Sequence, residues 1–60
     1  MTAAALTAWR KRLDLSKVEA CRRLGLSRTS LDAYESGRAR IPLYVALACA
    51  ALAYGLPPIQ

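Results

Sequence analysis

Hydrophobic residues recur at intervals of three and four along most of this chain, and short polar or glycine-containing breaks interrupt the spacing. Leu6, Trp9 and Leu13, for example, fall on one face of a helix. The spacing predicts four helices, over about residues 2–13, 17–24, 28–36 and 42–54. The pattern therefore predicts an all-α fold, a compact bundle of four to five short helices.

The breaks between these helices carry residues that start or stop a helix. Ser16 and Glu19 have the S-x-x-E spacing of a capping box at the start of the second helix. Gly25 favours the left-handed backbone that ends that helix, and Ser27 can cap the next one. Pro42 is expected to be the first residue of the fourth helix, because its fixed φ suits that position.

Only residues 25–27 separate the second helix from the third. So short a break is useful when two helices must meet at a steep angle. Leu26 is expected to fill the turn, Leu31 to anchor the third helix, and the small side chain of Cys21 to lie where the helices cross. The spacing predicts a helix-turn-helix over about residues 17–36, a motif whose second helix enters the major groove of DNA.

Charge is distributed unevenly along the chain. Nine Lys and Arg residues oppose four Asp and Glu residues, for a net charge of +5, and every charged residue lies between Arg10 and Arg40. The basic part favours a polyanionic partner, and the uncharged end from Ile41 onward favours a hydrophobic one. A basic surface without a specific partner would produce the same net charge.

The composition argues against several classes of protein. There is no histidine, and Cys21 and Cys49 lie far apart without a CxxC motif, so no metal, cofactor or disulfide framework is expected. Without paired carboxylates or a phosphate-binding loop, we expect no enzyme. The apolar stretch 41–56 falls short of the roughly 18 residues that cross a bilayer, and no basic region precedes an apolar signal segment. We expect a cytoplasmic protein with no membrane partner and no small-molecule ligand.

The stretch LSKVEACRRLGLSRTSLDAYESGRARIP, residues 15–42, resembles the Cro/lambda-repressor-like (XRE) helix-turn-helix family. The residues that match the family's pattern are Trp9, Arg10, Leu13, Leu15, Ser16, Glu19, Leu24, Gly25, Ser27, Arg28, Leu31, Tyr34, Glu35, Gly37, Arg38 and Pro42. The resemblance covers about residues 6–52. It implies a single lambda-repressor-like DNA-binding domain over residues 1–60, of the kind found in small phage or mobile-element regulators.

Four residues of the third helix are expected to face the bases: Arg28, Thr29, Asp32 and Ala33. Arg28 can donate to O6 and N7 of guanine, and its charge opposes the helix dipole, so it has no stabilising role at that position. Thr29 fits a base contact and a phosphate contact equally well. Asp32 could accept from cytosine N4, but pairing with Arg28 four residues away is favoured. Ala33 can offer only apolar contact, for example to a thymine methyl.

Five residues are expected to contact phosphates: Lys17, Ser27, Arg38, Arg40 and Arg10. Lys17 stands where the family usually has a glutamine that touches a phosphate and steadies the first recognition residue. A lysine can meet a phosphate but cannot accept a hydrogen bond from Arg28. The two arginines after the third helix fit a flexible basic loop as well as a phosphate clamp. The resemblance places Arg10 near the DNA backbone and implies a structural salt bridge for Glu35.

The fourth helix is apolar on all sides, so it should be buried on all sides, and three short helices cannot cover it. The simplest partner is the same helix of a second copy related by two-fold symmetry. The expected contacts are Tyr44, Leu47, Ala48 and Ala51. A dimer would read a palindrome whose half-sites lie roughly 34 Å apart.

These features predict a homodimeric, sequence-specific regulator that binds double-stranded DNA. We expect a repressor or autoregulator that occludes a promoter, in a bacterial or phage setting and associated with the nucleoid. One alternative is an antitoxin-like or adaptor module that uses the C-terminal helix to bind another protein. A second alternative is a membrane-surface peptide, which would be helical only with lipid.

Overall fold

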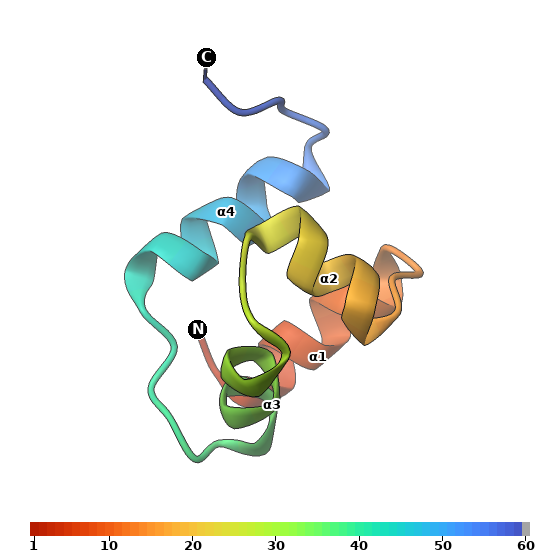
Figure 1. Cartoon of the computed structure of the whole chain (residues 1–60). Helices are drawn as coiled ribbons and strands as arrows, with labels where there is room; N and C mark the ends of the chain where they lie inside the picture. Colours follow the sequence, from red (N-terminus) through yellow and green to blue (C-terminus); the bar gives the residue numbers. More distant parts are fainter. Residues whose placement is uncertain (60) are drawn as a thin grey trace.

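The computed structural model describes residues 1–59, which form four helices and no strand. The helices are α1 (Ala3–Arg12), α2 (Lys17–Leu24), α3 (Arg28–Ser36) and α4 (Leu43–Ala53) (Figure 1). The all-α prediction is confirmed, and the second and third helices begin and end where they were expected. The prediction for Pro42 is wrong by one position, because its extended ψ of 154° makes it the residue before α4.

Side-chain oxygens cap the first three helices. Thr2 Oγ1 accepts from the Ala5 amide at 3.0 Å, Ser16 Oγ from the Glu19 amide at 3.1 Å, and Ser27 Oγ from the Ser30 amide at 3.1 Å. These contacts satisfy N–H groups that have no partner within the helix. Only the serine half of the capping box forms, because the Glu19 carboxylate accepts instead from Arg22 Nη1 at 2.9 Å.

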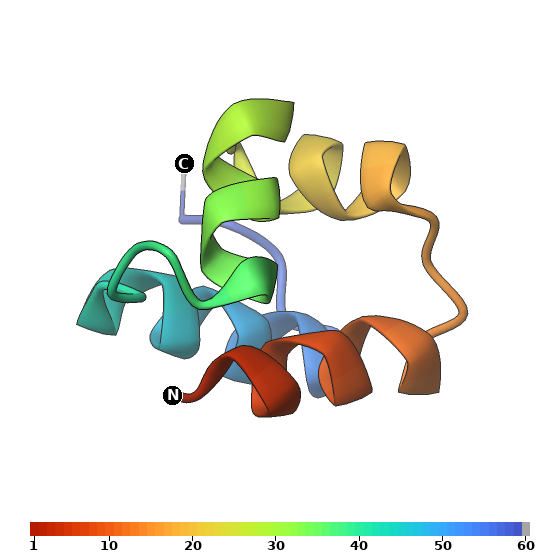
Figure 2. The same cartoon turned by 90° about the horizontal axis from the view of Figure 1, so that it is seen from below.

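The helices α2 and α3 cross at a steep angle. In Figure 1, α3 is seen almost end-on while α2 runs across the view, and Figure 2 shows the same crossing from below. Packing contacts join α3 to α1 and to α2, and join α4 to α1 and to α2. The helices α1 and α4 therefore support the α2–α3 pair from the side opposite its outer surface.

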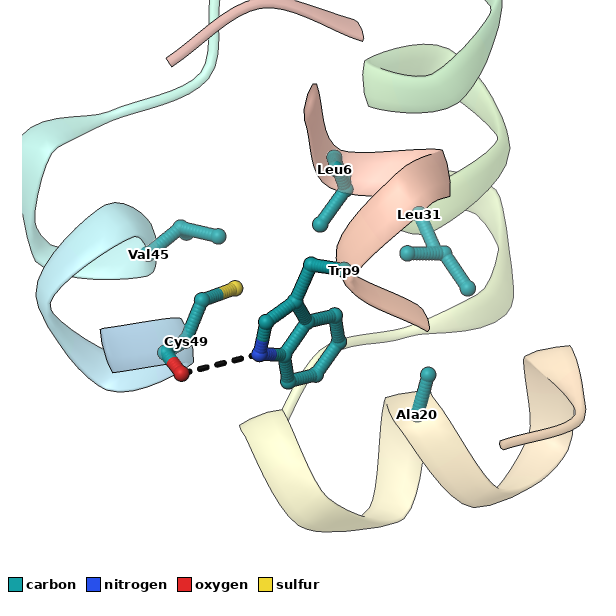
Figure 3. Close-up of a cluster of buried hydrophobic side chains, with 6 residues drawn as sticks. All are labelled: Leu6, Trp9, Ala20, Leu31, Val45 and Cys49. Carbon is teal, nitrogen blue, oxygen red and sulfur yellow. Dashed lines mark hydrogen bonds between the residues drawn. The ribbon is translucent and has the colours of Figure 1, made fainter. Parts of the chain in front are cut away.

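Six buried side chains from all four helices form the core: Leu6, Trp9, Ala20, Leu31, Val45 and Cys49 (Figure 3). Trp9 Nε1 donates to the carbonyl oxygen of Cys49 at 2.8 Å, which ties α1 to α4. Trp9 is thus a core residue, as its spacing indicated. Burial raises the pKa of the Cys49 thiol, which keeps it protonated and unreactive.

Two small residues of α2 pack inward. Ala20 is fully buried in the core, and Cys21 is partly buried and packs against it. The place of Cys21 at the crossing of α2 and α3 stays a prediction. Within the described chain, no helix is long and apolar enough to cross a membrane.

Candidate nucleic-acid interface

The turn between α2 and α3 directs α3 away from the body of the protein. Gly25 adopts a φ of 70°, and the Leu26 amide donates to the Cys21 carbonyl at 3.0 Å, which closes the end of α2. Leu26 is partly buried against the core, and Leu31 is fully buried from the next helix. These two anchors hold α3 by one face and leave its opposite face exposed.

The four residues expected to read bases do lie on this outer part of α3. Arg28 and Thr29 are exposed in the first turn, and Asp32 and Ala33 are half-buried one turn further along. The helix is therefore oriented so that its N-terminal residues face solvent together, as base reading would require.

Asp32 is the centre of a small charge cluster. Arg28 Nε lies 3.4 Å from Asp32 Oδ1, and Lys17 Nζ lies 3.3 Å from the same oxygen. Partial burial by itself would raise the pKa of Asp32, but the hydrogen bonds and charges of Lys17 and Arg28 outweigh it and lower that pKa. The carboxylate is therefore ionised at neutral pH, and it links the start of α2 to the start of α3.

A surface hollow of about 450 Å³ lies beside this cluster. Its lining residues come from the start of α2, from α3 and from the second residue beyond α3: Lys17, Arg28, Asp32, Glu35, Ser36 and Arg38. Arg38 Nε donates to Ser36 Oγ at 3.2 Å, which turns the arginine back toward α3. Three cationic side chains and two carboxylates therefore line this one hollow.

Arg10 has an internal partner. Its Nε and Nη2 donate to the Glu35 carboxylate at 2.8 and 3.2 Å, and its Nη1 donates to the Leu15 carbonyl at 3.2 Å. The side chains of Arg10 and Glu35 are only 14% and 9% exposed. The salt bridge expected for Glu35 is present. The phosphate contact of Arg10 stays a prediction, and the ion pair leaves little of its guanidinium exposed for that contact.

Burial would raise the pKa of Glu35, but the hydrogen bonds from Arg10 and Thr7 prevail and lower it. Thr7 Oγ1 donates to Glu35 Oε1 at 3.0 Å. The sequence did not indicate this threonine, because it lies 28 positions from Glu35 and no local spacing rule relates the two. The pair between Lys17 and Asp32 was missed for the same reason.

The remaining residues expected at phosphates lie at the two ends of α3. Ser27 caps the helix and also donates from Oγ to Ser30 Oγ at 3.0 Å. The exposed N-terminus of α3 still offers backbone N–H groups to an anion. Arg38 and Arg40 are exposed in the segment between α3 and α4.

The four residues expected at a dimer interface share one face of α4 but differ in exposure, and their role stays a prediction. Tyr44 and Leu47 are 64% and 62% exposed on the outer side of α4. Ala48 and Ala51 are half-buried and line a different hollow, of about 210 Å³, which the C-terminal residues from Leu56 help to form. Leu43 and Tyr54, which the sequence did not single out, are 75% and 83% exposed on α4 and just after it.

Four helices, a tight turn and an exposed, capped third helix define a helix-turn-helix domain, the architecture of a class of DNA-binding proteins. The family model described as "Helix-turn-helix domain" matches residues 3–60, and the chain belongs to that family. This membership supports the resemblance to the Cro/lambda-repressor-like group. Neither the curated proteins nor the solved structures contained a match.

Proposed function

We propose that this protein is a sequence-specific regulator of transcription that inserts α3 into the major groove of double-stranded DNA. The observation that carries the proposal is the placement of Arg28 and Thr29. They are exposed together in the first turn of α3, while Leu31 holds the helix from its buried side. Helix-turn-helix domains use the N-terminal residues of this helix to contact base edges.

The side chains on α3 favour particular base contacts. Arg28 uses Nε for Asp32, so both Nη groups remain for O6 and N7 of a guanine. Thr29 lies beside it, and Ala33 is small enough to admit a thymine methyl. Asp32 is engaged with two cations, so pairing is favoured over direct acceptance from a cytosine.

The phosphate contacts would come from both sides of α3. Lys17 approaches from the start of α2, Arg38 and Arg40 approach from beyond the C-terminus of α3, and Ser27 lies at its N-terminus. Arg10 would contribute mainly by holding the Glu35 side chain. Contacts of this kind set the position of the protein on the duplex and make binding depend on salt.

A second copy would complete the binding unit. Leu43, Tyr44, Leu47 and Tyr54 are large apolar or aromatic side chains that remain exposed on α4 or beside it. Covering them in a symmetric dimer removes apolar surface from water and places two recognition helices on one palindromic site. Repression would then follow from occlusion of a promoter, and a cytoplasmic protein of bacterial or phage origin fits this function.

The test measures binding of the full chain to the DNA upstream of its own gene. Fluorescence anisotropy is the readout, at two salt concentrations. A scrambled duplex of equal length is the control. Strong preference for the native duplex that persists at the higher salt is expected for an autoregulator. Equal binding to both duplexes, falling steeply with salt, would show attraction to phosphates alone and would refute sequence-specific control of its own gene.

The dimer is tested separately by sedimentation, with Leu47→Glu as the variant. We expect the wild-type chain to sediment as a dimer and the variant as a folded monomer with weaker binding to DNA. A wild-type monomer that still selects a palindrome would contradict the proposed interface.

The exposed side of α4 also favours a second candidate function, an antitoxin-like or adaptor module. The same apolar residues that would cover a second copy could instead bind a different protein. A stable 1:1 complex with the product of a neighbouring gene, with no self-association of this chain, would support that alternative.

A further inference from the structure

One carboxylate oxygen receives cations from both helices of the helix-turn-helix. Lys17 Nζ lies 3.3 Å and Arg28 Nε lies 3.4 Å from Asp32 Oδ1. Lys17 is the first residue of α2, and Arg28 is the first residue of α3. Asp32 therefore joins the starts of two helices that also meet through the turn and the core.

The position of the contact on Arg28 determines which of its donors remain available. A guanidinium presents its N–H donors in one rigid plane, and two of them are needed to reach O6 and N7 of guanine. Because Asp32 accepts from Nε, both Nη groups stay available at the far end of the plane. The Arg28 side chain is 53% exposed, so without this contact it would have to be ordered on binding.

Lys17 contacts the same carboxylate oxygen from the start of α2. The side chains of Lys17 and Asp32 are 39% and 40% exposed, which is less than that of Arg28. The lysine cannot accept a hydrogen bond and so cannot hold Arg28 directly. Asp32 supplies the acceptor that Lys17 lacks. Lys17 holds the Asp32 carboxylate, and that carboxylate holds Arg28.

The carboxylate also affects binding to every other DNA sequence. It places one negative charge among the cations that face the phosphates, so it weakens the attraction to any duplex. On a duplex with guanine in the right place, the held arginine recovers that loss through two direct hydrogen bonds. On other duplexes nothing compensates for the repulsion.

We infer that Asp32 is a positioning and specificity-determining residue, which holds Arg28 for a guanine and lowers affinity for DNA that lacks that guanine. The inference rests on the proposed function, since it presumes that α3 reads bases. It assigns to Asp32 no direct base contact.

The first experiment selects duplexes from a randomised pool with the wild-type chain and with Asp32→Asn, and then measures affinities by anisotropy. We expect the variant to bind unrelated duplexes more tightly and to lose about three- to five-fold in preference for guanine at one position of each half-site, as suits an exposed ion pair. Unchanged guanine preference would overturn the inference.

Asp14→Asn is the matched control. It removes the same charge from the exposed loop between α1 and α2, and asparagine tolerates the φ of 58° at this position. We expect it to tighten binding to all duplexes alike and to leave the guanine preference unchanged. An equal loss of preference in both variants would mean that net charge alone is responsible, and this would overturn the inference.

A double-mutant cycle combines Asp32→Asn with Arg28→Ala. If Asp32 acts through Arg28, its substitution should then have no further effect on guanine preference. An undiminished effect in the Arg28→Ala background would show that Asp32 acts independently, for example by contacting a base itself, and would overturn the positioning role.

A measurement without DNA separates this inference from the proposed function. The ¹⁵N relaxation of Arg28 Nε in the free protein should show an ordered group that becomes mobile in Asp32→Asn, while the backbone spectrum stays unchanged. Equal mobility in both proteins would overturn the inference. If the wild-type chain selects no consensus sequence, the proposed function fails, and the relaxation data still decide whether Asp32 holds Arg28.

Discussion

Replacing Glu35 with glutamine should destabilise this small domain more than any change to an exposed ion pair. The substitution keeps the shape of the side chain but removes its charge, and Arg10, only 14% exposed, then has no counterion. Breaking a buried pair in this way costs about 3–5 kcal/mol, and the partial exposure of this pair reduces our expectation to about 2–3 kcal/mol. A chain of this length has a total stability of about 3–9 kcal/mol. The variant should therefore lose a large fraction of its stability.

The assay is urea unfolding followed by the fluorescence of Trp9, which is 7% exposed in the folded state. Glu19→Gln is the control, because the pair of Glu19 with Arg22 is 42% and 71% exposed and should contribute less than about 1 kcal/mol. A loss in Glu35→Gln no larger than the loss in the control would refute the structural role of the pair.

The same experiment has a pH dependence of known sign. The folded-state pKa of Glu35 is lowered from its ordinary value of 4.5, so its contribution is fully present above that value. As the pH falls through the folded-state pKa, the wild-type chain should lose this stabilisation and approach the variant. A stability difference that stays constant from neutral pH to strongly acidic pH would contradict the ion pair.

Three further substitutions test other parts of the structure. Trp9→Phe removes the 2.8 Å hydrogen bond to the Cys49 carbonyl and should cost about 1–3 kcal/mol in urea unfolding followed by far-UV circular dichroism, since the variant lacks the fluorescent tryptophan; no loss would mean that this bond does not join α1 to α4. Gly25→Ala should cost only about 1–2 kcal/mol, since an added Cβ meets no atom within 4 Å and only the left-handed φ of 70° opposes it; failure to fold would contradict the open turn. Arg28→Ala should cost about 1–3 kcal/mol of binding free energy on the specific duplex and relax the base preference at one position. Arg40→Ala should weaken binding to all duplexes alike and reduce its salt dependence. If Arg28→Ala weakened binding to specific and unrelated duplexes equally, Arg28 would not be a base-reading residue.

Local chemistry accounts for the parts of the fold that could be predicted. Helix starts depend on contacts between residues three apart, such as Ser27 Oγ with the Ser30 amide, and a helix end depends on a single left-handed residue such as Gly25. Both are visible in a short stretch of sequence. The position of Pro42 was wrong by one residue because its φ suits both the residue before a helix and the first residue within it.

The exposed residues of α3 could also be anticipated, since the buried position of Leu31 determines which side of a helix faces out. The exposed residues of α4 could not be anticipated in this way. On a helix that is apolar on all sides, no periodicity separates Tyr44, which is exposed, from Ala48, which lines a hollow near the C-terminal residues. Only the positions of α2 and of the segment after α4 decide this.

Local sequence features were therefore enough to predict the helices, the side-chain caps of the first three helices, the helix-turn-helix and the outward side of α3. Which charges far apart in the sequence meet depends on the tertiary structure. Lys17 and Asp32 are 15 positions apart, and Arg10 and Glu35 are 25 apart, so neither pair follows from helical spacing. These pairs exist because the steep crossing of α2 and α3 over α1 brings distant residues within hydrogen-bonding distance.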